Sequence, residues 1–301
     1  MRLGIFVENS RMSRGSADID AYVAAIKEVA DAGFASAWSP QVFGMDALTA
    51  LALAGREAPG IELGTSVVPI YPQHPTTLAQ HALTTQFALG GRLVLGLGLS
   101  HQIVVENMWG YSFDKPAKHM EEYLDVLQPL LTTGKVSFQG STVKANADLR
   151  LPEGNDVPVM LAALGPRMLA LAGSRTAGTI TWMTGPETIA NHIAPSIGKA
   201  AAEAGRPSPR VVMALPVAVT DDEAGARERA GQLFAMYGML PSYRAMLDRE
   251  GAGGPADVAI VGDKASVQRQ VSAMEEKGAT DFVAAPFDNR EATLAALAEL
   301  L

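Results

Sequence analysis

Short runs of apolar and β-branched residues alternate along this chain with longer stretches rich in alanine and leucine. We identify eight strand candidates, and several of them are apolar at consecutive rather than alternating positions. Consecutive apolar residues are typical of parallel strands that are buried on both faces. The predicted strands are Leu3–Glu8, Ser36–Ser39, Glu62–Ile70, Arg92–Leu99, Pro158–Ala162, Thr179–Met183, Val211–Thr220 and Asp281–Ala285.

Helical patterns lie between these strands, and this alternation predicts an α/β fold, specifically a (β/α)8 TIM barrel. The alternative is an open doubly wound sheet, which usually carries G-x-G-x-x-G after its first strand. Here the first strand runs into Glu8-Asn9. The nearest glycine pattern, Gly96-Leu97-Gly98, lies in the fourth strand and lacks the third glycine. We therefore reject the dinucleotide-binding sheet and predict the barrel.

Two connections are too long to be simple turns. The first, residues 101–156 after strand four, contains a helix and then an irregular stretch after Gly134. The second, residues 221–262 after strand seven, contains a helix near Glu223–Tyr237 and a tail rich in glycine and proline. We expect both to be insertions at the C-terminal face of one barrel domain that spans residues 1–301, where they are candidate substrate walls.

Composition narrows the function. The chain has 24 Lys+Arg against 32 Asp+Glu, a net charge of −8, which argues against a nucleic-acid partner. It has no cysteine, and its five histidines lack metal-ligand spacing, so we expect no metal site. The apolar stretch Met1–Val7 is too short for the core of a secretion signal, and no apolar run reaches the ~20 residues of a membrane helix. We expect a cytoplasmic protein with no membrane partner.

Barrel enzymes place their chemistry where the strands end at the C-terminal face. The motif Gly165-Pro166-Arg167 follows strand five and marks the start of a helix. It is either an ordinary helix start or a phosphate-binding site, since free N–H groups and a guanidinium both bind anions. His101 directly follows strand four and is a candidate acid or base, a hydrogen-bond donor to a cofactor, or a structural histidine. Trp38 and Trp182 lie at strand ends, where they form either a slot for a flat ring or part of the core.

Several motifs together resemble the bacterial luciferase-like family. They include Leu63-Gly64-Thr65-Ser66-Val67, His74-Pro75 and the segment of residues 90–98, Gly-Gly-Arg-Leu-Val-Leu-Gly-Leu-Gly, and they occur in the expected order along essentially the whole chain. The resemblance implies a (β/α)8 barrel that binds FMN or the deazaflavin coenzyme F420. The sequence most resembles the F420-dependent branch, which includes methylenetetrahydromethanopterin reductase.

The resemblance also implies the positions of a cofactor site. It implies a non-prolyl cis peptide bond at Ser66–Val67, a ring lined by Leu99 and Ser100, and a phosphate held by Leu164, Gly165 and Arg167. The full set of implied cofactor-binding residues is Ser66, Val67, Pro69, Leu99, Ser100, Ala163, Leu164, Gly165, Arg167 and Thr184.

Two departures from the branch limit what can be carried over. His101 stands where the glucose-6-phosphate enzyme of this branch has a catalytic glutamate, and Pro40-Gln41 stands where related enzymes often have an aspartate-based sequence. We predict an F420-dependent oxidoreductase that transfers a hydride between C5 of the deazaflavin and a small organic substrate, with His101 as the catalytic residue. The predicted substrate-binding residues are Trp38, Gln41, Tyr237 and Tyr243.

Two other functions stay open at this point. One is an FMN-dependent monooxygenase on the same barrel, because FMN and F420 share a ring outline and a ribityl phosphate. The other is a cofactor-binding barrel without turnover, since the familiar acidic residues are missing. The family often forms dimers, so a homodimer is a further expectation.

Overall fold

The structure is a computed structural model that describes residues 1–9, 18–150 and 156–301. The chain divides into two compact units, each built from segments that are distant in sequence. Unit 1 comprises Met1–Val7, Glu28–Trp38 and Ala163–Leu301, and unit 2 comprises Glu8–Lys27 and Ser39–Ala162. The single domain of residues 1–301 stays a prediction.

Unit 1 is built on parallel strands. Strand β1 (Arg2–Phe6) lies between β2 (Ser36–Ser39) and β12 (Asp281–Pro286), with Ile5 paired to Ala37 and to Ala284. The ten-residue strand β10 (Arg210–Val219) pairs in parallel with β12, with β9 (Gly178–Trp182) and with the short β11 (Ile260–Gly262). Eight consecutive residues of β10 are buried, as expected for a strand covered on both faces.

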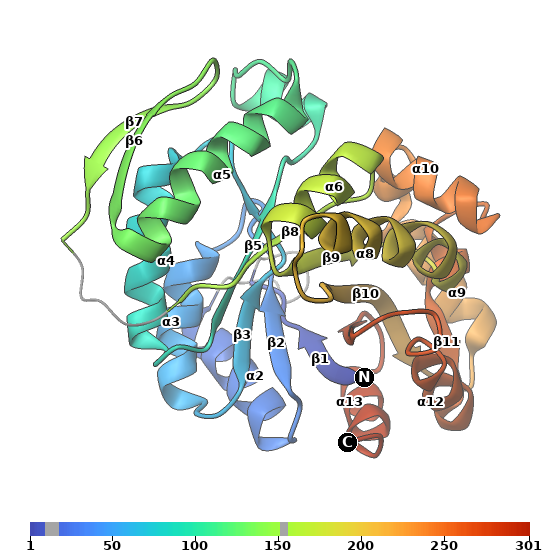
Figure 1. Ribbon diagram of the computed structural model, residues 1–301. Helices are drawn as coiled ribbons and strands as arrows, with labels where there is room; N and C mark the ends of the chain where they lie inside the picture. Colours follow the sequence, from blue (N-terminus) through green and yellow to red (C-terminus); the bar gives the residue numbers. More distant parts are fainter. Residues whose placement is uncertain (10–17, 151–155) are drawn as a thin grey trace. The chain divides into compact units, whose positions relative to one another are not determined.

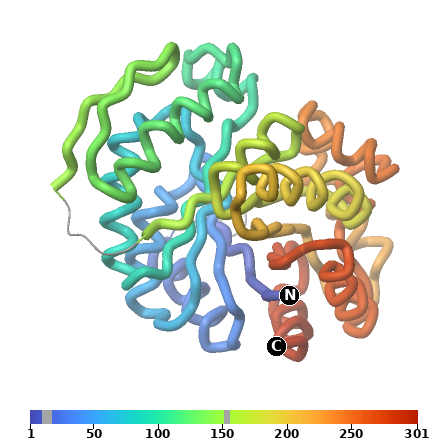
Figure 2. Tube along the Cα trace, viewed as in Figure 1, coloured from blue at the N-terminus to red at the C-terminus, as the bar shows by residue number. Residues whose placement is uncertain are grey.

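Helices of unit 1 follow its strands (Figure 1). Arg290, at the start of α13 (Arg290–Ala298), forms an ion pair at 2.6 Å with Glu28 of α2 (Ile19–Asp31). Both chain ends belong to this unit, and Figure 2 marks them. The helices are α6 (Pro166–Arg175), α7 (Pro186–Thr188), η2 (Ile189–Ile193), α8 (Ala194–Glu203), α9 (Glu223–Leu233), η3 (Ala235–Gly238), α10 (Pro241–Glu250), α11 (Pro255–Val258), α12 (Lys264–Ser272) and α13 (Arg290–Ala298).

Unit 2 repeats the same alternation. Strand β5 (Leu93–Gly98), buried along its whole length, pairs in parallel with β3 (Glu62–Thr65), β4 (Val68–Pro69) and β8 (Val159–Leu161). The helices are α3 (Ala47–Glu57), α4 (Pro75–Ala88), η1 (Val104–Met108) and α5 (Pro116–Thr133).

The eight predicted strands are all present within the described residues, and the one predicted over Glu62–Ile70 is divided into β3 and β4. One local expectation was wrong. The stretch after Gly134 is not irregular but forms an antiparallel hairpin, β6 (Lys135–Gln139) with β7 (Lys144–Asp148). In the second insertion the predicted helix near Glu223–Tyr237 is divided into α9, which ends at Leu233, and η3. The strand β11, which follows the Gly/Pro-rich tail, was not predicted.

The β6–β7 hairpin lies beside α5 (Figure 1). One buried carboxylate of α5, that of Glu122, holds the turn of the hairpin. Glu122 is 3% exposed and accepts hydrogen bonds from the backbone N–H groups of Ser141 (3.0 Å), Thr142 (2.6 Å) and Val143 (3.1 Å). It also accepts bonds from the Ser141 and Thr142 hydroxyls at 2.7 and 2.8 Å. A Cβ at Gly140 would lie 2.4 Å from the Glu122 carboxylate, so the turn needs glycine there. The turn of the hairpin is therefore built around this side chain.

We expect Glu122→Gln to lower the free energy of unfolding by about 1.5–3 kcal/mol near neutral pH, because charge-assisted hydrogen bonds are lost. Burial alone would raise the pKa of Glu122, but the hydrogen bonds from Thr142 and Ser141 outweigh burial and hold this pKa well below its ordinary value. The depressed folded-state pKa means that this stabilisation is present above the unfolded-state pKa of about 4.3 and fades as the pH falls below it. Urea unfolding of both proteins between pH 7 and pH 3 measures the difference, which should shrink as the pH falls.

The matched control is Glu121→Gln on the same helix, because Glu121 is 43% exposed and pairs with Lys118 at the surface. Its loss should stay within about 0.5 kcal/mol. Equal losses for the two variants, or a difference that does not change with pH, would contradict the role given to Glu122.

Candidate active site

The step between β3 and β4 contains the implied cis peptide bond, at Ser66–Val67, which is confirmed. Thr65, just before it, joins β3 to β5, because its hydroxyl donates to the Gly96 carbonyl at 2.8 Å and accepts from the Gly96 N–H at 2.9 Å. A Cβ at Gly98 would lie 2.5 Å from the Val67 side chain, so a glycine in β5 is what lets Val67 pack there. Ser66 and Val67 are half-buried and therefore reachable by a ligand.

Strand β5 ends in a sharp turn that carries His101. Ser100 has φ +59°, in the left-handed region that residues other than glycine seldom adopt. The His101 carbonyl then accepts the N–H groups of Val104 and Val105, both at 2.9 Å, and begins a short helical segment. Leu99, Ser100 and His101 are half-buried. Burial lowers the pKa of His101, so its imidazole is neutral at neutral pH.

Trp38 and Gln41 both have structural contacts. The Trp38 indole is fully buried in unit 1, and its Nε1–H donates to the Ser36 hydroxyl at 2.9 Å. In unit 2 the Gln41 side-chain oxygen accepts the Ala47 N–H at 3.2 Å, at the start of α3. Their substrate-binding roles stay predictions, and the burial of Trp38 places its ring in the core rather than on an accessible surface.

The segment that leads into α6 is fixed from both sides within unit 1. The backbone of Ala163 is hydrogen-bonded to the Thr179 hydroxyl through both N–H and carbonyl at 3.3 Å, and the Leu164 carbonyl accepts from His192 Nε2 at 2.8 Å. Gly165 then caps the helix without a side-chain hydrogen bond, and a Cβ placed on it would meet open space. Arg167, in the first turn, is exposed and makes no hydrogen bond or ion pair with any residue that the structure describes.

A second helix of unit 1 starts with the same Gly-Pro pair but has its N–H groups already occupied. Glu250, at the end of α10, accepts the N–H groups of Glu187 (3.0 Å) and Thr188 (2.7 Å) in the first turn of α7. A Cβ on Gly185 would lie 2.2 Å from the Glu250 carboxyl carbon. The chain therefore supplies its own anion to α7 and none to α6 among the described residues.

Aromatic rings gather around the end of β9 in unit 1. Trp182 stacks on Phe6 with ring centroids 5.6 Å apart and meets Phe234 and Tyr237 edge-on, each at 5.9 Å. Tyr237 meets Tyr243 at 5.3 Å in turn. With Phe287, which meets Phe234 at 5.8 Å, these rings form what we term the aromatic cluster: Phe6, Trp182, Phe234, Tyr237, Tyr243 and Phe287.

The sequence indicated only part of this cluster. Tyr237 and Tyr243 were predicted to bind substrate, and burial raises the pKa of Tyr243 above its ordinary value. Phe6, Phe234 and Phe287 were missed. The position of Trp182 at a strand end was the available signal, but nothing in the sequence indicated which distant rings would meet it.

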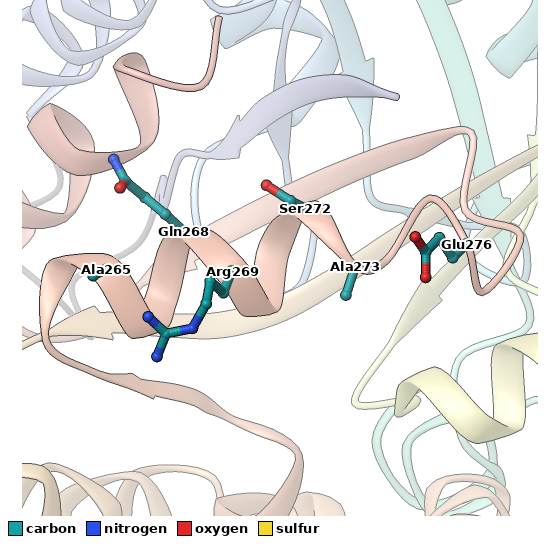
Figure 3. A pocket seen from close by; sticks show the side chains of 6 residues that line it. All are labelled: Ala265, Gln268, Arg269, Ser272, Ala273 and Glu276. Carbon is teal, nitrogen blue, oxygen red and sulfur yellow. The ribbon is translucent and has the colours of Figure 1, made fainter.

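Other features of the described residues lie outside these strand ends. A hollow of about 510 Å³ lies along α12, but the side chains that line it point in different directions and include no predicted site residue (Figure 3). Within the described ranges, no cluster of three metal-ligating side chains occurs and no helix is both long and apolar enough to span a membrane.

Comparison with known proteins assigns the family. The sequence profile of the luciferase-like monooxygenases matches residues 1–294. A protein of Mycobacterium tuberculosis, provisionally named as a coenzyme F420-dependent oxidoreductase, is 30% identical, with 84% of this chain and 87% of the relative covered. The 5,10-methylenetetrahydromethanopterin reductase of Methanolobus tindarius is 27% identical, with 76% and 70% covered.

Comparison with solved structures identifies the fold. The structure of an F420-dependent secondary alcohol dehydrogenase in complex with an F420-acetone adduct is similar, with a TM-score of 0.83 at 19% identity, over 100% of this chain and 98% of that one. The predicted (β/α)8 barrel is confirmed by this likeness. The chain is a member of the luciferase-like monooxygenase family.

Proposed function

We propose that this chain binds coenzyme F420 and is an oxidoreductase acting on a small organic molecule. The observation that carries the binding of a phosphate-bearing cofactor is the open start of α6, where Gly165 and Arg167 present donors that the described residues leave unused. Such a helix start is a ready-made site for a phosphate group. The relatives named for coenzyme F420 support the same ligand.

The residues at α6 fit the phosphate end of the coenzyme. The first-turn N–H groups and the Arg167 guanidinium would bind it, and the fixed backbone of Ala163 and Leu164 would hold that turn in place. A positive group here opposes the net charge of −8. Thr184 is buried and donates its hydroxyl to the Trp182 carbonyl at 3.2 Å, so its contact with a cofactor stays a prediction.

The residues around the ends of β4 and β5 fit the ring end. Ser66, Val67, Leu99 and Ser100 are half-buried and small or apolar, while Pro69 is buried and held in the ladder beside Gly98. A flat ring needs such a surface, because burying it against apolar atoms is what favours its binding. We propose these five residues as the ring contacts.

Bound F420 supplies the deazaflavin C5 that accepts or donates a hydride, and the protein supplies orientation and proton transfer. His101 would take the proton of a substrate hydroxyl during oxidation and return it during reduction. Its imidazole is neutral at neutral pH and therefore ready to accept a proton. Tyr237 and Tyr243 would form an apolar wall for the substrate, together with Met236 and Met239, which are 59% and 75% exposed. A homodimer and a cytoplasmic location stay predictions.

Separate titrations of the purified protein with F420 and with FMN test the cofactor. We expect F420 to bind saturably, which is measured by the quenching of its fluorescence. FMN should bind more weakly. In the same experiment, Arg167→Ala should weaken F420 binding about 10–100-fold, the usual value of a charge-assisted hydrogen bond. Lys199→Ala is the matched control, because Lys199 is an exposed cation on α8 and should leave the affinity unchanged.

Two outcomes would favour the alternatives. Tight FMN binding with no F420 binding would replace the proposal with an FMN-dependent monooxygenase, which the name of the family itself favours. F420 binding without hydride exchange toward secondary alcohols, ketones or other acceptors would favour a barrel that binds its cofactor without turnover. An Arg167→Ala affinity equal to that of Lys199→Ala would remove the helix start from the site.

A further inference from the structure

The indole N–H of Trp182 is buried and has no hydrogen-bond acceptor among the described residues. Buried tryptophan N–H groups usually have a hydrogen-bond acceptor, because an unpaired buried N–H keeps the full free-energy penalty of desolvation. Trp38 follows this rule, since its N–H donates to Ser36. An unpaired donor therefore needs an explanation at Trp182.

The backbone around Trp182 holds the ring in a defined place. Met183 has φ +50°, in the left-handed region, and its side chain is fully buried. The Thr184 hydroxyl donates to the Trp182 carbonyl at 3.2 Å, and Phe6 stacks on the indole with an interplanar angle of 17°. Trp182 is thus a fixed donor at the carboxyl end of β9, where barrel enzymes bind their substrates.

The surroundings of this donor are aromatic. The rings that contact Trp182 are those of Phe6, Phe234 and Tyr237, and none of these side chains carries a formal charge. Of these rings, Tyr237 lies in the four-residue η3, next to the exposed Met236 and close in sequence to the exposed Met239. A ligand that parts Tyr237 from Trp182 would meet a flat apolar surface with one donor in it.

We propose that Trp182 is a specificity-determining residue whose Nε1–H donates a hydrogen bond to the oxygen of an apolar, ring-containing ketone or alcohol. This inference rests on the proposed function, because it identifies the substrate class of the same enzyme. The aromatic cluster binds the hydrocarbon part of the substrate, and the indole N–H selects molecules with an oxygen acceptor over hydrocarbons of the same shape.

A matched pair of probes tests this without cofactor or turnover. Acetophenone has a ring and a carbonyl oxygen, and ethylbenzene has nearly the same shape without the acceptor. We expect acetophenone to shift the Trp182 indole N–H resonance downfield in proton–nitrogen NMR spectra of the full chain, saturably, while the Trp38 resonance stays in place. Ethylbenzene should leave the Trp182 N–H without that downfield shift.

Trp182→Phe keeps an aromatic ring and removes the N–H donor together with part of the ring surface, and it also identifies the resonance. In this variant acetophenone should lose about 2–10-fold more affinity than ethylbenzene does, because both probes lose the same ring surface but only acetophenone loses the hydrogen bond. A thermal melt close to that of the wild type checks that the variant is folded, and the two probes on the wild-type protein keep the test independent of it.

Several results would overturn the inference. One is the absence of acetophenone binding at millimolar concentration, and a second is binding that does not move the Trp182 resonance. A third is an equal loss of affinity for the two probes in Trp182→Phe. The F420 titration is a separate measurement on the same protein. If the chain does not bind F420 but the Trp182 resonance still shifts, the assignment of the coenzyme is wrong and the substrate site stands. If the chain binds F420 but the Trp182 resonance does not shift, only the role of Trp182 is wrong.

Discussion

Replacing His101 with alanine should lower turnover by about 10²–10⁴-fold, the usual contribution of a general acid or base, and leave F420 affinity nearly unchanged. The imidazole follows a turn that Ser100 fixes at φ +59°, and the His101 carbonyl anchors the segment that follows, so the side chain leaves a rigid backbone. Steady-state kinetics with F420 and the small alcohol or ketone that supports turnover measure the rate, and fluorescence titration measures the affinity.

The pH dependence separates a catalytic role from a structural one. Burial lowers the pKa of His101 below its ordinary value near 6.5, so neutral imidazole predominates at pH 7. In oxidation the neutral form accepts the proton, and activity should fall as the pH drops through this lowered pKa. In reduction the protonated form donates, and activity should rise over the same range. The Ala variant should lose this limb of the profile in both directions.

The control for this experiment is His81→Ala. His81 lies on α4, contacts Thr49 and Asp46 at 3.3 Å, and has no place in the proposed chemistry, so activity should be unchanged. Turnover of His101→Ala within about twofold of the wild type would remove His101 from the mechanism, because a general acid or base contributes far more than that.

Replacing Asp281 with alanine should lower the free energy of unfolding by about 3–5 kcal/mol, the usual cost of breaking a buried ion pair. Asp281 is 1% exposed at the start of β12. It receives Arg210 Nη2 at 2.6 Å and Nε at 3.2 Å, the Thr280 hydroxyl at 2.7 Å and Arg2 Nη1 at 3.4 Å. One carboxylate thus joins the starts of β1, β10 and β12.

Urea unfolding measures this loss, and Asp281→Asn should lose less because the amide keeps one acceptor. Asp248→Ala is a matched control at the surface, where Asp248 is 66% exposed and pairs with Arg244. It should change the free energy of unfolding by no more than about 0.5 kcal/mol. A loss below about 1 kcal/mol for Asp281→Ala would mean that the two guanidiniums find equivalent partners without it, which buried ion pairs rarely do.

The strands were predictable because each is a local pattern. Runs such as Leu93-Val94-Leu95 are apolar at every position, and all of β5 is buried. The β6–β7 hairpin was missed because it is mostly exposed, so its residues carry little apolar signal, and Glu122 that shapes its turn lies about twenty residues away in sequence. Short β11 was missed for a related reason, since three residues are too few to form a recognisable pattern.

The candidate site was predictable only where all of its residues are adjacent in one segment of the sequence. Gly165, Pro166 and Arg167 are adjacent in sequence, and their type alone indicates an anion site. The contrast with α7 was not predictable, because Glu250 lies 62 residues beyond Thr188. Trp38 was placed correctly at a strand end, but strand position does not say whether a side chain points into the core, and here it does.

The open start of α6 also has a consequence for selectivity. A helix start with free N–H groups and an arginine attracts any phosphate-bearing molecule, including nucleotides and inorganic phosphate. Such a feature increases affinity for many ligands without distinguishing among them. Under the proposed function, the choice among phosphate-bearing cofactors would rest on the apolar residues around Val67 and Leu99 and not on α6. Changing cofactor preference by mutation should therefore begin at the strand ends and leave α6 as it is.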